Sequence, residues 1–100
     1  MSVCSVSIVP MGKGTSISDT LAKCLRVLDK FSDLKSQITP MSTQLEGKTE
    51  RVLEAVKAMH EAAFTPGIGR VYTTITLDDR RDKEVTLESK VTSVKAKLKS

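Results

Sequence analysis

The side chains that could do chemistry in this chain are few and dispersed. Its single histidine, His60, falls on the apolar face of an expected helix, where a lone histidine is more often packed and hydrogen-bonded than catalytic. The serines lie outside any nucleophile elbow, and only His60 could activate one of them. Cys4 and Cys24 have neither metal-ligand spacing nor a disulfide framework around them. We therefore expect no enzyme, no cofactor and no metal site, and two reduced cysteines that behave as small hydrophobes.

Hydroxyl and carboxylate groups do gather on one side of the expected strands. Residues 70–78 alternate without a break, which predicts a half-buried antiparallel strand, and their polar face carries the only tyrosine, Tyr72. Glu46 is expected to point to the same face of the sheet, near Ser7 and Tyr72. A carboxylate there needs a cationic or donating partner, which would be Arg70 or a lysine, or else a cationic ligand.

Two further motifs could bind an ion. Gly12-Lys13-Gly14 precedes a helix and could hold an anion on free backbone amides, but it matches no phosphate-binding fingerprint, so a plain strand-to-helix turn is the favoured interpretation. The charged run 78–83 contains three aspartates that could attract magnesium. Its alternating signs favour local or intersubunit ion pairs instead.

The elements that must position these side chains follow one another in the order β-α-β-β-α-β-α. Strands are expected over 3–9, 34–39, 42–46 and 70–78, and helices over 18–31, 49–65 and from Thr86 onward, with Ser18 and Thr49 as N-caps. This order is that of the split βαβ unit. We predict one α+β domain, residues 1–100, with a ferredoxin-like βαββαβ plait, an antiparallel sheet covered on one face by two helices, and an additional C-terminal helix.

The sheet face away from the helices is expected to be polar. A solvated face usually carries more long charged side chains, so we favour contact with another sheet or a ligand over simple solvent exposure. The strand 70–78 is an edge strand that needs a partner or a cover. The C-terminal helix has a spare apolar stripe that must cover part of a sheet or a neighbouring subunit. The open-face residues are Ser5, Ser7, Gln37, Thr39, Gln44, Glu46, Arg70, Tyr72 and Thr74, and the stripe is Leu87, Val91, Val94 and Leu98.

Composition narrows the classes of partner. Aromatic residues make up 3% of the chain and the formal net charge is +4, whereas a nucleic-acid binder would add a basic stripe with stacking aromatics. No apolar run approaches ~18 residues and no signal-peptide pattern is visible, so we expect a cytoplasmic protein with no membrane partner. A chain of this size buries only ~65% of its unfolded surface, which makes self-association a sensible way to bury more.

Five stretches with preserved spacing carry a family resemblance. They are Ile8-Val-Pro-x-Gly12 with Ser16-x-Ser18, Thr39-Pro-Met-Ser-Thr-x-Leu-Glu-Gly47, Val56-x-x-Met-His-Glu61, Gly69-Arg-Val-Tyr-Thr-Thr74 and Asp78-Asp-Arg-Arg-Asp-Lys83. Together they resemble the small thiamine-binding protein family (YkoF-like), over nearly the whole chain. One departure is Ser42, which stands where the family usually has glycine.

The resemblance implies a ferredoxin-like subunit that forms dimers or tetramers and binds thiamine or its hydroxymethylpyrimidine part in the cytosol, without catalysis. Self-association would use the sheet faces, the sheet edges and the C-terminal helix. Two alternatives stay open: a structural or regulatory homo-oligomer with no small-molecule ligand, and an enzyme that uses His60. A carboxylate, hydroxyls and a tyrosine ring would complement the thiazolium cation and the aminopyrimidine, the ring by cation–π contact. The predicted ligand-binding residues are Ser7, Thr43, Glu46, Tyr72 and Thr74.

Overall fold

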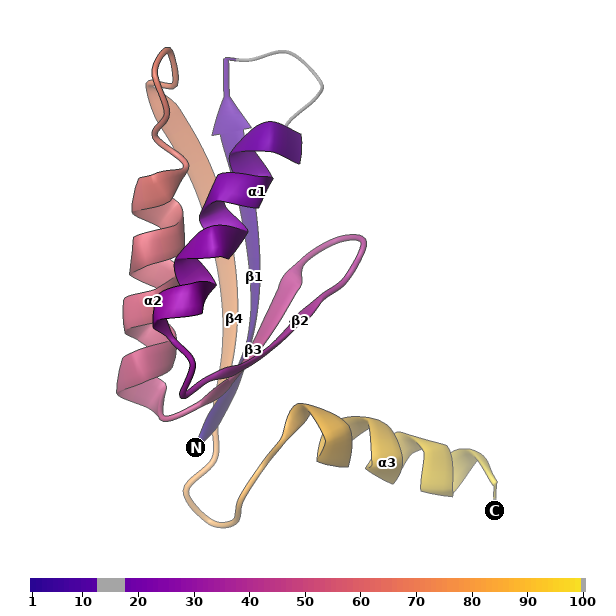
Figure 1. Cartoon of the computed structure of the whole chain (residues 1–100). Helices are drawn as coiled ribbons and strands as arrows, with labels where there is room; N and C mark the ends of the chain where they lie inside the picture. The colour runs from indigo at the N-terminus through magenta and orange to yellow at the C-terminus, as the bar shows by residue number, and fades with distance from the viewer. Residues whose placement is uncertain (13–17, 100) are drawn as a thin grey trace.

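The computed structural model describes residues 1–12 and 18–99 (Figure 1). Within them, four strands form one antiparallel sheet in the order β2-β3-β1-β4. The prediction of a ferredoxin-like plait is confirmed, and β2 and β4 are the edge strands, as expected. The elements are β1 Ser2–Met11, α1 Ser18–Arg26, the 3₁₀ helix η1 Val27–Lys30, β2 Lys35–Ile38, β3 Thr43–Gly47, α2 Thr49–Ala62, β4 Arg70–Asp79 and α3 Leu87–Leu98. The glycine-rich turn considered for anion binding falls partly outside the described residues.

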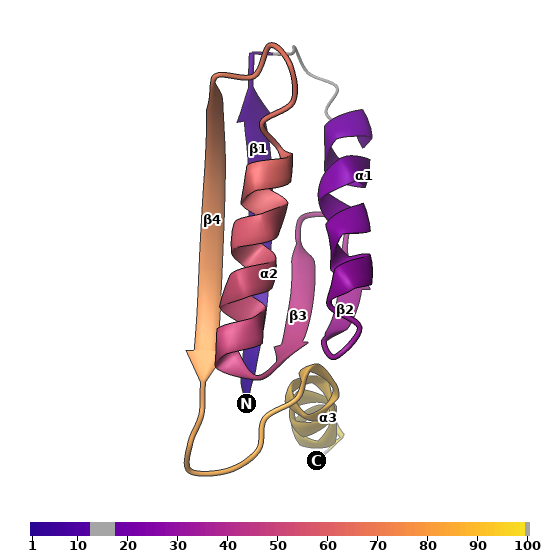
Figure 2. The same cartoon turned by 60° about the vertical axis from the view of Figure 1, so that its left-hand side comes forward.

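The core lies between the sheet and the helices α1 and α2, which cover one of its faces (Figure 2). Alternation places Cys4, Val6 and Ile8 of β1 on this face, where each is buried. Leu45 of β3 and Met59 of α2 are also buried against them. The core is aliphatic, as the scarcity of aromatic residues predicts.

Three helix ends differ from the sequence-based expectation. α2 ends at Ala62, before the expected Thr65. The α-helical part of the first helix ends at Arg26, and a 3₁₀ turn continues it to Lys30. The tighter turn brings side chains three apart onto one side, so Leu28 and Phe31 still pack against the core. The expectation that Thr49 caps α2 is wrong: Lys48 occupies the N-cap, and the Thr49 hydroxyl hydrogen-bonds to that of Ser2 instead.

The strands of the sheet are unequal in length, and this shapes the molecule. β1 pairs with β4 along its whole length, from Ser2 to Met11, but with β3 only from Ser2 to Val6. Beyond that point the hairpin of β2 and β3 bends away from β1 (Figure 1). The second half of β1 therefore has an open edge on the β3 side.

Helix α3 projects from one end of the sheet instead of packing along it (Figures 1 and 2). Its N-terminus is held by a capping box between Thr86 and Ser89. None of its residues is buried, and the chain's radius of gyration is 15.0 Å, against ~13 Å for a compact chain of this length. α3 does not cover the edge of β4, because the helix starts beside β3 and forms a groove with β2 on the opposite edge of the sheet.

The C-terminal half of β4 is more exposed to solvent than its alternating pattern predicts. Val71 and Thr73 are half-buried, but Ile75 and Leu77, on the same face, are 44% and 38% exposed. The reason is that α2 covers β1 and the near side of β4 only (Figure 2). In the part of the chain that the structure describes, no helix is both long and apolar enough to cross a bilayer.

Candidate functional site

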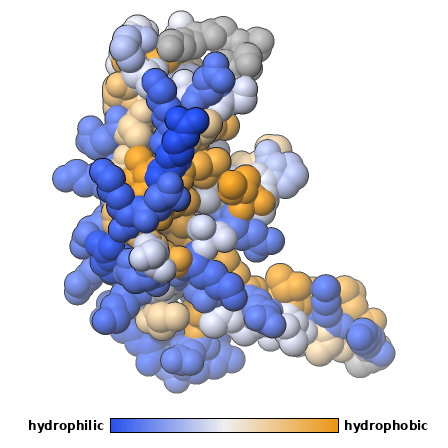
Figure 3. Space-filling model, in the orientation of Figure 1, coloured by the Kyte–Doolittle hydropathy of each residue, from blue (hydrophilic) through white to orange (hydrophobic). Residues whose placement is uncertain are grey.

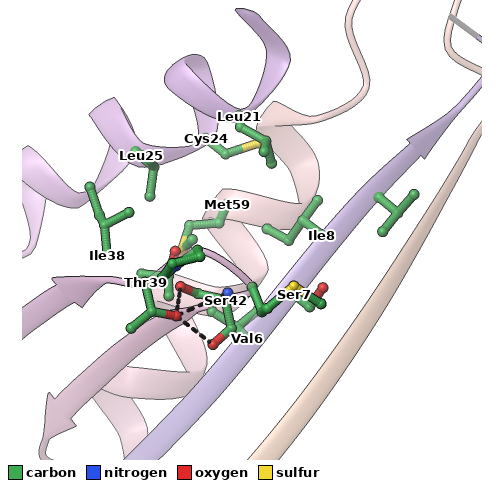
Figure 4. Close-up of a pocket in the computed structure, with 14 residues that line it drawn as sticks. Val6, Ser7, Ile8, Leu21, Cys24, Leu25, Ile38, Thr39, Ser42 and Met59 are labelled. Carbon is green, nitrogen blue, oxygen red and sulfur yellow. Dashed lines mark hydrogen bonds between the residues drawn. The ribbon is translucent and has the colours of Figure 1, made fainter. Parts of the chain in front are cut away.

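A pocket of about 270 Å³ lies where β1 loses its β3 partner (Figure 4). Its walls are the second half of β1, helix α1 and the hairpin between β2 and β3, and Met59 of α2 closes its inner end. We call it the edge pocket. It is lined by Val6, Ser7, Ile8, Val9, Leu21, Cys24, Leu25, Ile38, Thr39, Pro40, Met41, Ser42, Thr43 and Met59.

The edge pocket runs alongside β1 and does not lie over either face of the sheet. Successive residues of a strand point to opposite faces, yet four consecutive residues of β1, 6–9, all line the pocket. Ile8 faces the helices and Ser7 faces the open side. Only a cavity beside the edge of β1 can contact residues that point to opposite faces of the sheet. The cavity therefore exists because β3 ends before it reaches this part of β1.

Two of the predicted site residues, Ser7 and Thr43, supply hydroxyl groups to the edge pocket. Neither hydroxyl hydrogen-bonds to any residue that the structure describes. Thr43 lies on the helix side of β3, because it pairs with the inward-facing Val6. The two hydroxyls are therefore available to a ligand.

The hairpin wall is held by a separate hydroxyl cluster. The Thr39 Oγ1 accepts from the Ser42 backbone N–H at 3.1 Å and donates to the Ser42 carbonyl at 2.8 Å. The Ser42 Oγ also accepts from the Gln44 side-chain amide at 2.8 Å and from the Ser5 hydroxyl at 3.1 Å. Ser42, which departs from the family's usual glycine, has no positive φ, so the serine fits the turn and adds contacts to it.

Among the residues that the structure describes, no charged side chain lines the edge pocket. Cys24 lies in its wall, and burial raises the pKa of the thiol despite an opposing hydrogen bond from its own backbone. A protonated thiol is a poor nucleophile. The pocket is thus a neutral, largely apolar site with a few hydroxyl groups, which suits binding better than covalent chemistry.

Glu46 has a structural partner. Its Oε1 accepts a hydrogen bond of 2.7 Å from the backbone N–H of Leu87, the first residue of α3. The expected donating partner is thus a backbone N–H of the same chain, in place of Arg70 or a lysine. The expected proximity of Glu46 to Tyr72 is wrong, because they lie opposite Val3 and Val9 of β1, which are ~20 Å apart along a strand at ~3.3 Å per residue.

Tyr72 and Thr74 lie on the open face of β4 and do not line the edge pocket. Tyr72 is 59% exposed. The open face is not exposed along its whole length, because Val3, at the other end of the sheet, is buried. The role of Tyr72 and Thr74 in ligand binding stays a prediction, separate from the edge pocket.

His60 and the charged turn have the local partners that sequence favours. The His60 Nδ1 and the Thr73 hydroxyl hydrogen-bond at 2.7 Å, and the imidazole meets the Phe64 ring edge-to-face at 5.4 Å.

The turn after β4 contains ion pairs between Arg80 and Asp82 and between Arg81 and Asp79. Among residues 1–12 and 18–99, no three His, Cys, Asp or Glu side chains are grouped as they would be around a metal ion.

Sequence reasoning missed the apolar lining of the edge pocket, above all Leu21, Leu25 and Ile38. Helical periodicity assigns the two leucines to the core, and they do pack against it. A signal was present: the expected strand 3–9 is longer than the expected strand 42–46. Such a mismatch leaves part of a strand without a neighbour.

Comparison with known proteins adds the family. The model of the family described as "Thiamine-binding protein" matches residues 4–95. The chain belongs to this thiamine-binding protein family. It is 41% identical over 102 residues to the protein YqgV of Bacillus subtilis, covering 98% of each chain.

Solved structures of similar proteins confirm the fold. The crystal structure of a hypothetical protein from Methanocaldococcus jannaschii superimposes with a TM-score of 0.85 at 38% identity, over 93% of this chain and 94% of that one. A Thermotoga maritima protein assigned provisionally to thiamine biosynthesis or salvage gives a TM-score of 0.76 at 18% identity, over 93% and 97% of the two chains. The second likeness is one of fold alone.

Proposed function

We propose that this protein binds thiamine or its hydroxymethylpyrimidine part, without catalysis, as a cytoplasmic homo-oligomer. The observation that carries the proposal is the edge pocket of a member of the thiamine-binding family. It is a largely apolar cavity lined by Ser7 and Thr43, whose hydroxyls have no partner among the described residues. Ligand sites in proteins have this composition: mostly apolar walls with a few placed polar groups.

The size and charge of the edge pocket favour the pyrimidine over the whole vitamin. Its volume of about 270 Å³ is at the lower limit of the ~300–1,000 Å³ typical of small-molecule sites. A thiazolium cation would find no carboxylate in the lining, since Glu46 is engaged at the start of α3. A neutral aminopyrimidine ring meets neither difficulty.

We propose binding without catalysis because of the positions and protonation of the two candidate catalytic groups, His60 and Cys24. The Nδ1 of His60 is engaged by Thr73, and His60 is not in the lining of the edge pocket. The Cys24 thiol is in the lining, but burial favours its protonated form. His60 thus lies away from a ring bound in the pocket, and the Cys24 thiol beside that ring is a poor nucleophile in its protonated form.

Calorimetric titration with 4-amino-5-hydroxymethyl-2-methylpyrimidine, and separately with thiamine, tests the ligand. Thr43→Val removes one pocket hydroxyl with little change of shape and should weaken pyrimidine binding by about tenfold, the worth of one hydrogen bond. Thr76→Val is the matched control, because it makes the same change at an exposed position of β4 outside the pocket. Absence of heat with both ligands at millimolar concentration would contradict the proposal, and an equal loss in both variants would contradict the site.

Self-association is the second part of the proposal, and the exposed apolar surfaces support it. β4, whose outer edge is unpaired, exposes Ile75 and Leu77, and α3 exposes Val91 and Val94. Apolar surface is visible along the projecting α3 (Figure 3). Unpaired sheet edges with apolar side chains favour pairing with another chain. These surfaces also support the alternative of a purely structural homo-oligomer, which the calorimetry above would distinguish.

Sedimentation velocity tests the assembly. The wild-type chain should sediment as a dimer or tetramer. Ile75→Lys places a charge at the free edge and should shift the distribution toward monomer, whereas Lys57→Ala, an exposed change on α2, should not. A wild-type chain that sediments as a monomer at all concentrations would refute this part of the proposal.

A further inference from the structure

Pro10 determines which backbone groups of β1 face β4 and which face the opposite side. β1 and β4 pair in an unbroken register that sets Pro10 opposite Val71. In an antiparallel pair, opposed residues alternate between those that exchange two hydrogen bonds and those that exchange none. Proline has no N–H to donate, so this pair is of the second kind, and Val9 opposite Tyr72 is of the first. The odd-numbered residues of β1 therefore bond to β4, and the even-numbered residues point their N–H and C=O groups toward β3.

Ile8 is consequently left with a donor and an acceptor that have no protein partner. Val6, the previous even-numbered residue, lies opposite Thr43, where β3 begins. No part of β3 lies beside Ile8, and Ile8 makes no other backbone hydrogen bond within the described chain. The residue is only 6% exposed. Buried N–H and C=O groups are nearly always paired, so this pair of groups points to a missing partner.

The missing partner must lie in the edge pocket, because the pocket occupies the side of β1 that the Ile8 backbone faces. In an extended strand the N–H and C=O of one residue point the same way and lie close together. They would pair with the C=O and N–H of Met41 if β3 extended that far in the same register. A ligand with one acceptor beside one donor can take the same place.

We propose that the backbone N–H and C=O of Ile8 recognise the ligand, and that they select planar heterocycles in which a ring nitrogen lies next to an amino group. The inference rests on the proposed function and adds the atoms that read the ligand. The ring nitrogen accepts from the Ile8 N–H, and the amino group donates to the Ile8 C=O. An aminopyrimidine has this pair of groups, whereas a thiazolium ring has neither.

The side chains around Ile8 suit the same ligand. Leu21 and Leu25 of α1 and Met59 of α2 give the ring apolar walls that exclude water and strengthen the two backbone bonds. The hydroxyl of Thr43, on the same side of the sheet as these walls, serves a second polar substituent on the ring. Selectivity for the amino group would then come from the backbone, and no side-chain substitution alone would abolish it.

Nuclear magnetic resonance of the whole chain tests the proposal with a matched pair of probes: 4-amino-5-hydroxymethyl-2-methylpyrimidine and its analogue with a methyl group in place of the amino group. On binding the first, the Ile8 amide should shift strongly and exchange with solvent at least about tenfold more slowly, while the Val9 amide, already paired, changes little. The methyl analogue should bind about tenfold or more weakly.

The outcomes separate this inference from the proposed function. If neither pyrimidine binds, the proposed function fails. If both bind equally, or if binding leaves the Ile8 amide unchanged, the protein binds the ring but the backbone recognition is wrong. A shift at Ile8 with strong preference for the amino compound supports both.

Semisynthesis gives a second test that changes a single backbone atom. Cys24 provides a natural ligation site between a synthetic segment 1–23 and an expressed segment 24–100, so the full chain can be joined and refolded. An ester between Ser7 and Ile8 removes the Ile8 N–H and should weaken binding of the aminopyrimidine about tenfold. An ester between Cys4 and Ser5 is the control: it removes a sheet N–H away from the pocket and should leave the affinity unchanged. Equal affinities in the two esters would overturn the proposal.

Discussion

Replacing Glu46 by alanine should release α3 from the sheet while the core stays folded. The Glu46 carboxylate accepts the Leu87 N–H at 2.7 Å, at the N-terminus of a helix that buries none of its own residues. A second tie between α3 and the sheet is the ion pair of Lys90 with Asp78. Both partners are substantially exposed, and such pairs contribute only ~0–1 kcal/mol.

The size of the effect follows from two contributions. A hydrogen bond to a charged group contributes ~1.5–3 kcal/mol, and a carboxylate near a helix N-terminus adds ~0.3–1 kcal/mol through the helix dipole. Loss of about 2–3 kcal/mol lowers the ratio of docked to undocked α3 by roughly 30- to 150-fold, at ~1.4 kcal/mol per factor of ten. A helix of 12 residues is marginal in isolation, so undocking should also unfold it.

Carbon chemical shifts and amide exchange of residues 87–98 measure the helix directly. In Glu46→Ala these signals should move toward random-coil values, with little change in the thermal midpoint of the core. Glu88→Ala is the control, because it removes a carboxylate from the first turn of α3 that is not bonded to the sheet. An intact α3 in Glu46→Ala, or equal loss in both variants, would refute the anchoring role.

Three further outcomes are expected. Leu45→Ala, at a fully buried position, should lower the free energy of unfolding in urea by ~2–5 kcal/mol. Gly67→Ala, at φ +90°, should destabilise the chain by ~1–2 kcal/mol, whereas Gly69→Ala, which has free space and no positive φ, should be nearly neutral in the same assay. The Arg80 guanidinium lowers the pKa of Asp82 to about 2, below the unfolded value of ~3.9. That ion pair is therefore fully present above pH ~4 and should be lost as the pH falls toward 2, which carboxyl chemical shifts would follow.

The parts of the fold that sequence predicts are those fixed by local periodicity. Alternation in β1 placed Cys4 and Ile8 inward and Ser7 outward, as the structure has them. The order of elements was enough to place β4 at an edge, because few topologies satisfy short, right-handed connections. None of these inferences needed the register between strands.

The errors come from register and from contacts between distant segments. Alternation says which face Glu46 and Tyr72 share, but only the pairing with β1 shows that they lie near opposite ends of it. The partner of Glu46 is a backbone amide 41 positions later in the chain, and no side-chain pattern encodes such a contact. The edge pocket arises from a difference in strand length, so it has no motif of its own.

The short hairpin between β2 and β3 can vary independently of the rest of the fold. Ile38 and Met41 are 67% and 85% exposed, and the connection Thr39–Ser42 is held by its own hydroxyl cluster. Insertions or substitutions there would resize one wall of the edge pocket without creating a cavity in the core. Proteins that share this fold could thus come to bind ligands of different size by changing a few surface residues of the hairpin. Selection for stability would act on the core, which these changes do not touch.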